Sequence, residues 1–523
     1  MTTEPTERAE SSPGAVATEA AAGAGSGPRN PLGRSNRWLV RAWIPIVLAL
    51  LAVAARVYSI QISGGFWGYL NPDEGAYFGS SFALINGVLP YRDIVLLHPP
   101  GVSLAYAPAA ATSWLIGEPN AFAAVRLMVV LVGAANTVLA YNIANRVGRT
   151  AAVAAGLMYA LWFPAVRTER TTLLEPLVNL ALLGSLALLN DKRLTTRRLI
   201  LAGVVGGLGI SVKLWALAPV AVLCVWLLTK GWRKALLYSA GVVGGTAAVL
   251  LPFLVVAPTS LVRMTVLDQL GRSGNGSVTI TERLAAMLNA SEATSTFQRL
   301  AVVLWLAIAI AAVLVALKSS RARPWVAMLA VNVGILLVAP TFFLNYTAFV
   351  AVPLVLTIGA CAQLVADRLC RFAPVALRVG AAVCIVLAMT TLLVLNRGLW
   401  RPAGESFPVR AATAAVAQGQ CVTSDSATAI ILTGHFSSNV EHGCPVVADF
   451  TGRVYETRGL PLARLRNPEF QAYALEYLLQ GDYVIIMRAK TDDLSAQSTQ
   501  TIAKRPVVFT SKYVVIYGPP TAP

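Results

Sequence analysis

The sequence predicts a polytopic α-helical membrane protein with about eleven spans, followed by a C-terminal extracytoplasmic α/β domain. Of its 523 residues, 56% are hydrophobic and only 13% are charged, whereas soluble domains carry about 25% charged residues. Apolar runs follow one another as far as residue 396, and after about residue 402 the chain becomes mixed and polar. These two observations place the membrane part first and the soluble part last.

The predicted spans are apolar runs long enough to cross the hydrocarbon core of a bilayer, which takes about 20 residues in a helix. Some of them are short, so any count from nine to thirteen is compatible with the sequence. The runs lie at residues 43–62, 121–142, 150–166, 173–190, 198–212, 214–230, 235–257, 298–317, 324–342, 346–366 and 376–396.

The positive charges lie in the short loops between spans and all fall on one side, as at Arg146 and Arg149 or Lys230 and Arg233. By the positive-inside rule that side is cytoplasmic, which puts the N-terminus inside and the C-terminus outside. The net charge of +17 therefore reflects topology, and we predict no nucleic-acid partner. The Ala- and Arg-rich composition favours a high-GC bacterium, and hence a bacterial cytoplasmic membrane.

Three domains are predicted. Residues 1–36 lack apolar periodicity and favour a disordered cytoplasmic tail. Residues 37–397 form the transmembrane domain. Its first apolar run starts late and lacks a small-residue cleavage site, which favours an uncleaved helix over a signal peptide. Residues 398–523 form the extracytoplasmic domain.

The loop at residues 63–120 is too long for a plain connector. Within it, residues 76–86 and 99–116 mix apolar and small polar positions, a pattern typical of helices that lie along the membrane surface. Its aromatic residues are expected to be interfacial anchors, with stacking on a sugar as the alternative. These are Phe66, Trp67 and Tyr69.

The last domain shows β-strand and helix patterns. Residues 483–487 and 513–517 predict strands, and residues 472–479 predict a helix. Cys421 and Cys444 both fall in this domain, where an oxidising compartment favours a disulfide. A metal site that adds the nearby histidines is the weaker alternative, because the spacing matches no standard zinc pattern.

An acidic run follows the first span, Asn71-Pro72-Asp73-Glu74-Gly75-Ala76-Tyr77. Two adjacent carboxylates beside a bilayer are costly to desolvate, so they are solvated, paired, metal-bound or catalytic. A second cluster follows about twenty residues later. It comprises Gly87-x-x-Pro90-Tyr91-x-Asp93 and then His98-Pro99-Pro100.

With these motifs the sequence resembles the GT-C superfamily of membrane glycosyltransferases. It is most similar to the branch of aminoarabinose transferases and protein O-mannosyltransferases. His98 is a departure, since aminoarabinose transferases carry a lysine before Pro-Pro. The resemblance implies transfer of a sugar from a polyprenyl-phosphate donor to a glycan, lipid or protein acceptor on the outer face. It also implies that Tyr77 and Tyr91 contact substrate.

In such a reaction a carboxylate takes the proton of the attacking hydroxyl. We expect Asp73 to be this base and Glu74 to assist it catalytically. The alternative is that both cap a short helix after Pro72, because helix N-termini favour carboxylates. Asp73 and Glu74 with water could also hold Mg²⁺ or Mn²⁺, and metal dependence stays open. Asp93 is a second candidate for substrate binding, with a turn or an ion pair to Arg92 as the alternative.

The leaving group of this reaction is a lipid phosphate, so cations are expected to face it. Lys213 interrupts an apolar stretch, where we expect phosphate binding rather than snorkelling to the headgroups. Arg170 lies in a dense charged patch with Arg167, Glu169 and Glu175, for which we expect an internal ion-pair network, with substrate contact by Arg170 as the alternative. His98 could hold phosphate, donate a proton, ligate a metal or simply pack, and Tyr346 could line the same cavity.

Two other classes of function compete with the enzyme. A transporter or lipid flippase would share the many spans but should show repeated halves and broken midplane helices, and no inverted repeat is evident. A non-catalytic assembly protein would tolerate loss of Asp73, whereas the enzyme would not.

Overall fold

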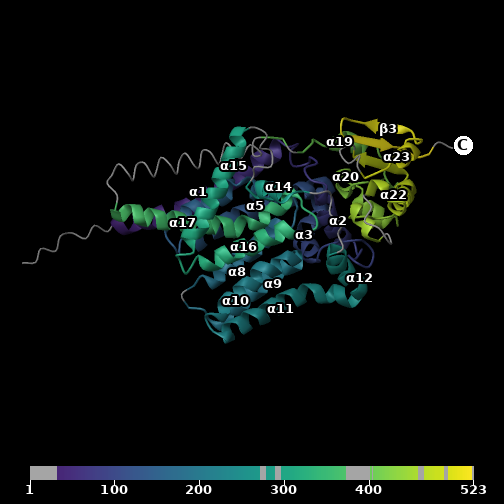
Figure 1. Cartoon of the computed structure of the whole chain (residues 1–523). Helices are drawn as coiled ribbons and strands as arrows, with labels where there is room; N and C mark the ends of the chain where they lie inside the picture. The colour runs from purple at the N-terminus through teal and green to yellow at the C-terminus, as the bar shows by residue number, and fades with distance from the viewer. Residues whose placement is uncertain are drawn as a thin grey trace, which may run out of the picture. The chain divides into compact units, whose positions relative to one another are not determined.

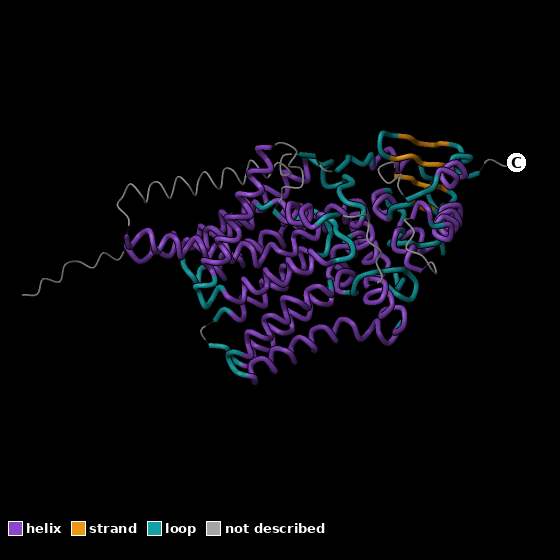
Figure 2. Tube along the Cα trace, in the orientation of Figure 1, coloured by secondary structure: helices purple, strands orange, loops and turns teal. Residues whose placement is uncertain are grey.

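Helices fill the chain as far as Phe372, and a small mixed sheet lies near the C-terminus (Figures 1 and 2). Residues 44–523 form one unit, and the contacts given below lie within it. The predicted span at 376–396 and most of the predicted N-terminal tail fall outside the described residues. The computed structural model describes residues 32–191, 193–270, 278–288, 296–372, 401–402, 404–456, 464–487 and 493–520.

Each predicted span in the described part coincides with helix. The first helix begins at Leu32, which is within the segment predicted as a tail. The helices are α1 (Leu32–Gln61), α2 (Asp73–Ile85), α3 (Gly101–Ala111), α4 (Ser113–Ile116), α5 (Glu118–Ala144), α6 (Arg149–Leu161), α7 (Phe163–Thr168), α8 (Glu175–Leu189), α9 (Thr196–Val212), η1 (Leu214–Ala216), α10 (Leu217–Leu228), α11 (Trp232–Val256), α12 (Pro258–Val262), the π-helix η2 (Arg263–Leu267), α13 (Asp268–Leu270), α14 (Ile280–Met287), α15 (Thr296–Ala316), α16 (Arg323–Val338), η3 (Leu344–Val350) and α17 (Ala351–Phe372).

Four of the described helical stretches are long and apolar enough to cross a membrane: Trp43–Gln61, Glu118–Ala144, Trp232–Val256 and Leu344–Leu369. Shorter apolar helices accompany them, among them Glu175–Leu189. The number of eleven spans stays a prediction.

Two helical stretches are broken where the sequence changes character. After α6, Trp162 is extended and Pro164 stands in the first turn of α7, where a missing backbone N–H costs nothing. Between α9 and η1, Lys213 adopts extended angles, with φ −150° and ψ 124°. The break predicted at Lys213 is present, and it turns this side chain out of the helical repeat.

Helices α9 and α11 meet along two pairs of glycines. A Cβ on Gly203 would lie 2.0 Å from the Tyr238 carbonyl oxygen, and one on Gly207 would lie 2.3 Å from that of Val242. Gly241 and Gly245 face the α9 backbone equally closely. Small residues four positions apart allow membrane helices to approach to backbone contact. The end of α9, and with it Lys213, is thereby held against α11.

The C-terminal α/β region contains a four-stranded sheet in the order β1-β2-β4-β3. The β1–β2 pair is parallel and the other two pairs are antiparallel. The strands and helix predicted near residues 483, 514 and 472 are present. The elements are α19 (Val409–Ala414), β1 (Val422–Ser424), α20 (Ala427–Leu432), α21 (Phe436–Glu441), η5 (Thr451–Glu456), η6 (Arg464–Arg466), α22 (Pro468–Gln480), β2 (Tyr483–Met487), α23 (Ala496–Ile502), β3 (Val507–Thr510) and β4 (Val514–Tyr517).

A disulfide joins Cys421, just before β1, to Cys444, with the two Cα atoms 5.5 Å apart. The bond closes a loop with a sequence separation of 23. A loop of that length stabilises the fold by about 3 kcal/mol in the chain-entropy account. It ties β1 to the end of α21.

The C-terminal region docks directly on the helix that begins with the acidic run. Helix α20 lies against α2 (Figure 1), and a Cβ on Gly75 would lie 2.4 Å from the Thr428 amide nitrogen. On α5, the Glu118 carboxylate accepts hydrogen bonds from the Phe436 and Ser437 amides at 2.9 and 2.6 Å. These are the first amides of α21, whose positive helix end favours a carboxylate. The region is therefore fixed to α2 by a close backbone approach and to α5 by hydrogen bonds to the Glu118 carboxylate.

Candidate functional site

Asp73 is the first residue of α2 and is partly exposed. Pro72 precedes it with helical angles, and the Asn71 side-chain oxygen accepts a hydrogen bond from the Asp73 amide at 2.9 Å. Pro72 occupies the N-cap position, and its side chain has no polar group that could cap the helix. The Asp73 carboxylate thus lies at the positive end of a helix, which favours its charged form.

Glu74, by contrast, is fully buried and held by an ion pair. Its two oxygens accept from Nε and Nη2 of Arg126 at 3.0 and 2.6 Å, and both side chains are 0% exposed. The Thr172 amide donates a further bond to Glu74 at 3.2 Å. Such a bidentate pair fixes orientation as well as charge. This arrangement favours a positioning role for Glu74 over the catalytic role we expected.

Arg126 extends the same anchor to the loop before α2. Its Nη1 donates to the carbonyl oxygens of Gly65 and Phe66 at 3.3 and 2.8 Å. In this loop Trp67 is exposed, as an interfacial anchor should be. Tyr69 is not such an anchor, because it is buried and its backbone pairs with Glu405 of the C-terminal region.

A second buried charge network lies among the spans. Arg56 of α1 pairs with Glu169, and both side chains are 0% exposed. Asn136 and Tyr159 donate to the other oxygen of Glu169 at 2.7 and 2.8 Å. Internal ion pairing was expected for the patch that contains Glu169, and the structure shows such a pair here. Both Arg56 and Glu169 thus have charged or hydrogen-bonding partners, which charges buried in a membrane protein require.

Arg170 follows directly and turns toward the start of α2. It is 2% exposed, and its Nη1 donates to the hydroxyls of Ser59 and Ser63 at 2.7 and 2.9 Å. It is close enough to Glu74 and Arg126 to interact electrostatically with both. Arg170 is thus a buried cation behind the first turn of α2.

The second motif forms a tight loop beside α2. Tyr91 has a φ of +70°, the left-handed region that non-glycine residues rarely adopt. Its buried hydroxyl donates to the His98 carbonyl oxygen at 2.6 Å. The His98 ring in turn stands edge-on to Tyr77, with centroids 5.6 Å apart. Three of the predicted substrate contacts, Tyr77, Tyr91 and His98, therefore meet in one place.

Asp93 lies in this loop but faces its own turn. It accepts from the Leu89 amide at 2.8 Å and pairs with Arg92 at 2.8 Å, with its side chain 33% exposed. The hydrogen bonds from Arg92 hold the pKa of the Asp93 carboxyl below its usual range. These contacts favour the alternative, in which Asp93 holds a turn and an ion pair, over a role in substrate binding.

Lys213 occupies a buried cage. Its Nζ lies 2.6 Å from a Glu175 oxygen, and both side chains are only 4% exposed. The ammonium also lies 4.5 Å from the centre of the Trp215 ring and 4.1 Å from that of Tyr346. Both distances suit a cation–π interaction. Lys213 and Tyr346, which the sequence placed in one cavity, are in contact.

The cage and the acidic run are neighbours. A Cβ on Gly101, next after the His98-Pro-Pro motif, would lie 2.5 Å from the Ser211 carbonyl oxygen, two residues before Lys213. Tyr106 of α3 interacts electrostatically with both Glu175 and Glu74, whose charges add to burial in raising its pKa. The start of α2, the His98 loop and the cage thus form one region of the molecule.

A divalent metal does not fit this arrangement well. Both oxygens of Glu74 are engaged by Arg126, which leaves Asp73 as the nearby carboxylate. Within the described residues no three His, Cys, Asp or Glu side chains are grouped as a metal site. The chemistry proposed below therefore uses no metal ion.

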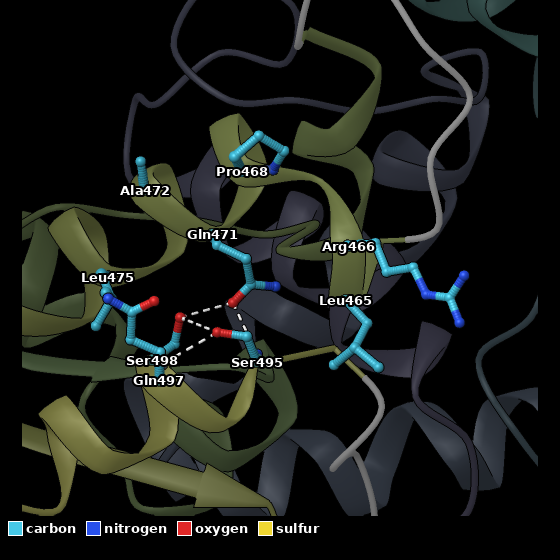
Figure 3. Close-up of a pocket in the computed structure, with 9 residues that line it drawn as sticks. All are labelled: Leu465, Arg466, Pro468, Gln471, Ala472, Leu475, Ser495, Gln497 and Ser498. Carbon is cyan, nitrogen blue, oxygen red and sulfur yellow. Dashed lines mark hydrogen bonds between the residues drawn. The ribbon is translucent and has the colours of Figure 1, made fainter.

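A separate groove of about 350 Å³ lies on the C-terminal region between η6, α22 and α23 (Figure 3). Gln471 lies at its centre and accepts from the Ser495 amide and the Ser498 hydroxyl, at 2.8 and 2.7 Å. Three of the polar residues lining the groove, Gln471, Ser495 and Ser498, thus bond to one another. We assign no ligand to it.

Comparison with solved structures shows the same architecture in two proteins. An oligosaccharyltransferase from Archaeoglobus fulgidus, tethered with an acceptor peptide, superposes with a TM-score of 0.57 at 12% identity, covering 86% of this chain and 70% of that one. ArnT from Cupriavidus metallidurans, in the apo state, superposes with a TM-score of 0.55 at 14% identity, covering 92% of this chain and 98% of that one. The chain has the GT-C fold.

Further matches agree with this fold. ArnT bound to undecaprenyl phosphate superposes with a TM-score of 0.54 at 15% identity, covering 90% of this chain and 97% of that one. A model of Glycosyltransferase family 87 matches residues 96–341. A search of curated protein sequences found no match. Together these results support glycosyl transfer by a multi-pass membrane protein of GT-C fold.

The sequence analysis missed two of the arginines that hold the site. Arg126 lies within the predicted span 121–142 and Arg56 within 43–62. An arginine inside an apolar span is costly unless it is paired, and that alone marks both as functional or structural positions. Their partners, Glu74 and Glu169, are 52 and 113 residues away along the chain.

Proposed function

We propose that this protein transfers a sugar from a polyprenyl-phosphate donor to an acceptor hydroxyl, with Asp73 as the general base. The acceptor oxygen attacks the anomeric carbon and forms the new glycosidic bond. The bond from that carbon to the phosphate oxygen breaks, and its electron pair leaves with the lipid phosphate. The acceptor proton passes to the Asp73 carboxylate.

The placement of Asp73 is the observation that carries this proposal. Its carboxylate is partly exposed, whereas the adjacent Glu74 is buried in a bidentate pair with Arg126. The pair fixes the first turn of α2 and so fixes the direction in which Asp73 points. A catalytic group held in this way is aligned before substrate arrives, which is where much of the rate gain from proximity originates.

The donor phosphate is assigned to the neighbourhood of Lys213, His98 and Arg170. Lys213 lies at a helix break beside the His98 loop, and Arg170 is a buried cation behind Asp73. The chemistry of two similar structures supports a lipid-linked donor. ArnT is described as bound to undecaprenyl phosphate, and the archaeal oligosaccharyltransferase AglB as complexed with dolichol-phosphate.

The acceptor is a glycan, glycolipid or exported protein that approaches from the side of the C-terminal region. That region packs on α2 at Gly75, two residues from Asp73. The positive-inside distribution of charge supports a position for both on the outer face of the membrane. An acceptor bound there would reach the carboxylate without crossing the bilayer.

The test is turnover in purified protein reconstituted in lipid, with a panel of polyprenyl-phosphate sugars. Asp73→Asn keeps size and hydrogen bonding but removes the base, and should lower kcat by about 10²- to 10⁴-fold. Asp191→Asn is the matched control, since Asp191 forms an ion pair with Arg198 in a loop predicted to be cytoplasmic. Parallel reactions with EDTA measure dependence on a divalent metal.

The outcomes separate the alternatives. Loss of turnover in folded Asp73→Asn alone supports the base. Full turnover in that variant rejects Asp73 and moves the search to Asp93. If donor lipids are moved across vesicles without sugar transfer, the protein is a flippase and the proposal fails.

A further inference from the structure

Lys213 already has a counter-ion in this structure. Its Nζ lies 2.6 Å from Glu175, and the described part of the chain offers it no second carboxylate. An ammonium group has three donors in all. The ring faces of Trp215 and Tyr346 flank it at 4.5 and 4.1 Å, and both are uncharged. The cage is therefore electrically neutral before any substrate enters.

A lipid phosphate that reaches Lys213 must share it with Glu175. The carboxylate and the phosphate are both negative, so each weakens the hold of the other on the ammonium. The neighbours reinforce this competition, because Trp215 and Tyr346 supply cation–π attraction but no further full charge.

The charge on the lipid changes during the reaction. A polyprenyl-phosphate sugar is a phosphodiester with one negative charge, whereas the released phosphate monoester carries about −1.5 to −2 at pH 7. The product is therefore the species that Lys213 would hold more tightly. A competing carboxylate beside Lys213 acts most strongly against that product.

We propose that Glu175 competes with the lipid phosphate for Lys213 and thereby promotes release of the phosphate product. This inference rests on the proposed function and on Lys213 as a phosphate contact. When the lipid phosphate leaves, Glu175 again neutralises the buried ammonium, so that Lys213 is never left without a counter-ion. Glu175 is in this sense a positioning residue, because it acts through Lys213.

Glu175→Gln tests the proposal by removing the competing charge while keeping the side-chain shape. The probe is undecaprenyl phosphate in detergent micelles, with undecaprenol and inorganic phosphate as separate arms. Coupling between two sites spans about 5- to 150-fold. We expect the variant to bind undecaprenyl phosphate about tenfold more tightly and undecaprenol unchanged. In turnover, KM and kcat should both fall, because product release becomes slower.

The controls separate competition from general disturbance. Asp367→Asn removes an exposed carboxylate near the far end of α17, whose preceding turn η3 carries Tyr346, and should leave binding unchanged. Adding Lys213→Met to Glu175→Gln should abolish the gain in affinity. If the affinity of Glu175→Gln for inorganic phosphate rises by the same factor, the cage recognises the phosphate group without its lipid.

The proposal is overturned if folded Glu175→Gln binds undecaprenyl phosphate no more tightly than wild type. Glu175 is then a structural counter-ion only. If Glu175→Gln does not fold, Glu175→Asp takes its place, since a shorter carboxylate holds Lys213 less closely and should give a smaller gain. An unchanged affinity in Glu175→Asp also overturns the proposal. Absence of sugar transfer in wild type, with the gain in affinity present, rejects the proposed function instead.

Discussion

Glu74→Gln should destabilise the protein strongly because Glu74 is buried in an ion pair with Arg126. The substitution leaves Arg126 charged, 0% exposed and without its bidentate partner. Removing one member of a buried ion pair costs about 3–5 kcal/mol. Two charge-assisted hydrogen bonds of about 1.5–3 kcal/mol each give a similar range, about 3–6 kcal/mol. Since about 1.4 kcal/mol corresponds to a factor of ten, the equilibrium constant for local unfolding around the first turn of α2 should rise by two to four powers of ten.

Activity should fall along with stability, since the first turn of α2 carries Asp73. A displacement of about 1 Å at a catalytic group can cost about 10²-fold in rate. Thermal unfolding in detergent, followed by tryptophan fluorescence, and turnover on the same samples measure the two effects. Asp191→Asn is the matched control, because its exposed pair should contribute no more than about 1 kcal/mol.

A double variant sharpens this test. Replacing both Glu74 and Arg126 with methionine removes both charges, and buried pairs replaced in this way often lose no stability. Recovery of the melting temperature without recovery of turnover would separate positioning from stability. A Glu74→Gln variant that melts like wild type would refute the reasoning, since the pair would then carry no net energy.

Two further predictions concern the C-terminal region. Burial lowers the pKa of His435 in the folded protein. Below the ordinary histidine pKa of about 6.5, the unfolded chain therefore binds a proton that the folded chain does not, and stability should fall as the pH drops. Substituting His435→Gln should make the melting temperature depend less on pH. Gly75→Val would place side-chain atoms against the Thr428 amide, 2.4 Å from the Cβ position, so limited proteolysis should release the C-terminal region faster than in wild type; equal cleavage rates would show that α20 does not need this close contact.

The architecture could be predicted because membrane spans are recorded in local composition. Each predicted span in the described residues coincides with helix, and the break at Lys213 followed from one charge in an apolar run. The strands at residues 483–487 and 514–517 likewise follow from runs of β-branched and aromatic residues. These signals extend over a few neighbouring residues and need no tertiary information.

The roles within the acidic run could not be predicted in the same way. Asp73 and Glu74 are adjacent in sequence, and only the fold distinguishes them. Arg126, 52 residues beyond Glu74, takes one carboxylate out of solvent and leaves the other at the surface. Tyr69 was misassigned for the same reason, because it is buried and its backbone pairs with Glu405, which lies far along the chain. Pairings over such separations follow from helix packing, which composition does not specify.

The backbone contact between α9 and α11 limits how this sequence can change over evolution. A methyl group at Gly203, Gly207, Gly241 or Gly245 would overlap a carbonyl oxygen of the opposite helix. Lipid-facing positions on the same helices can exchange one apolar residue for another freely. We expect related chains to vary widely along these two helices but to keep very small residues at these four positions. A designer who transplants the Lys213 break into another scaffold would have to carry the four glycines with it.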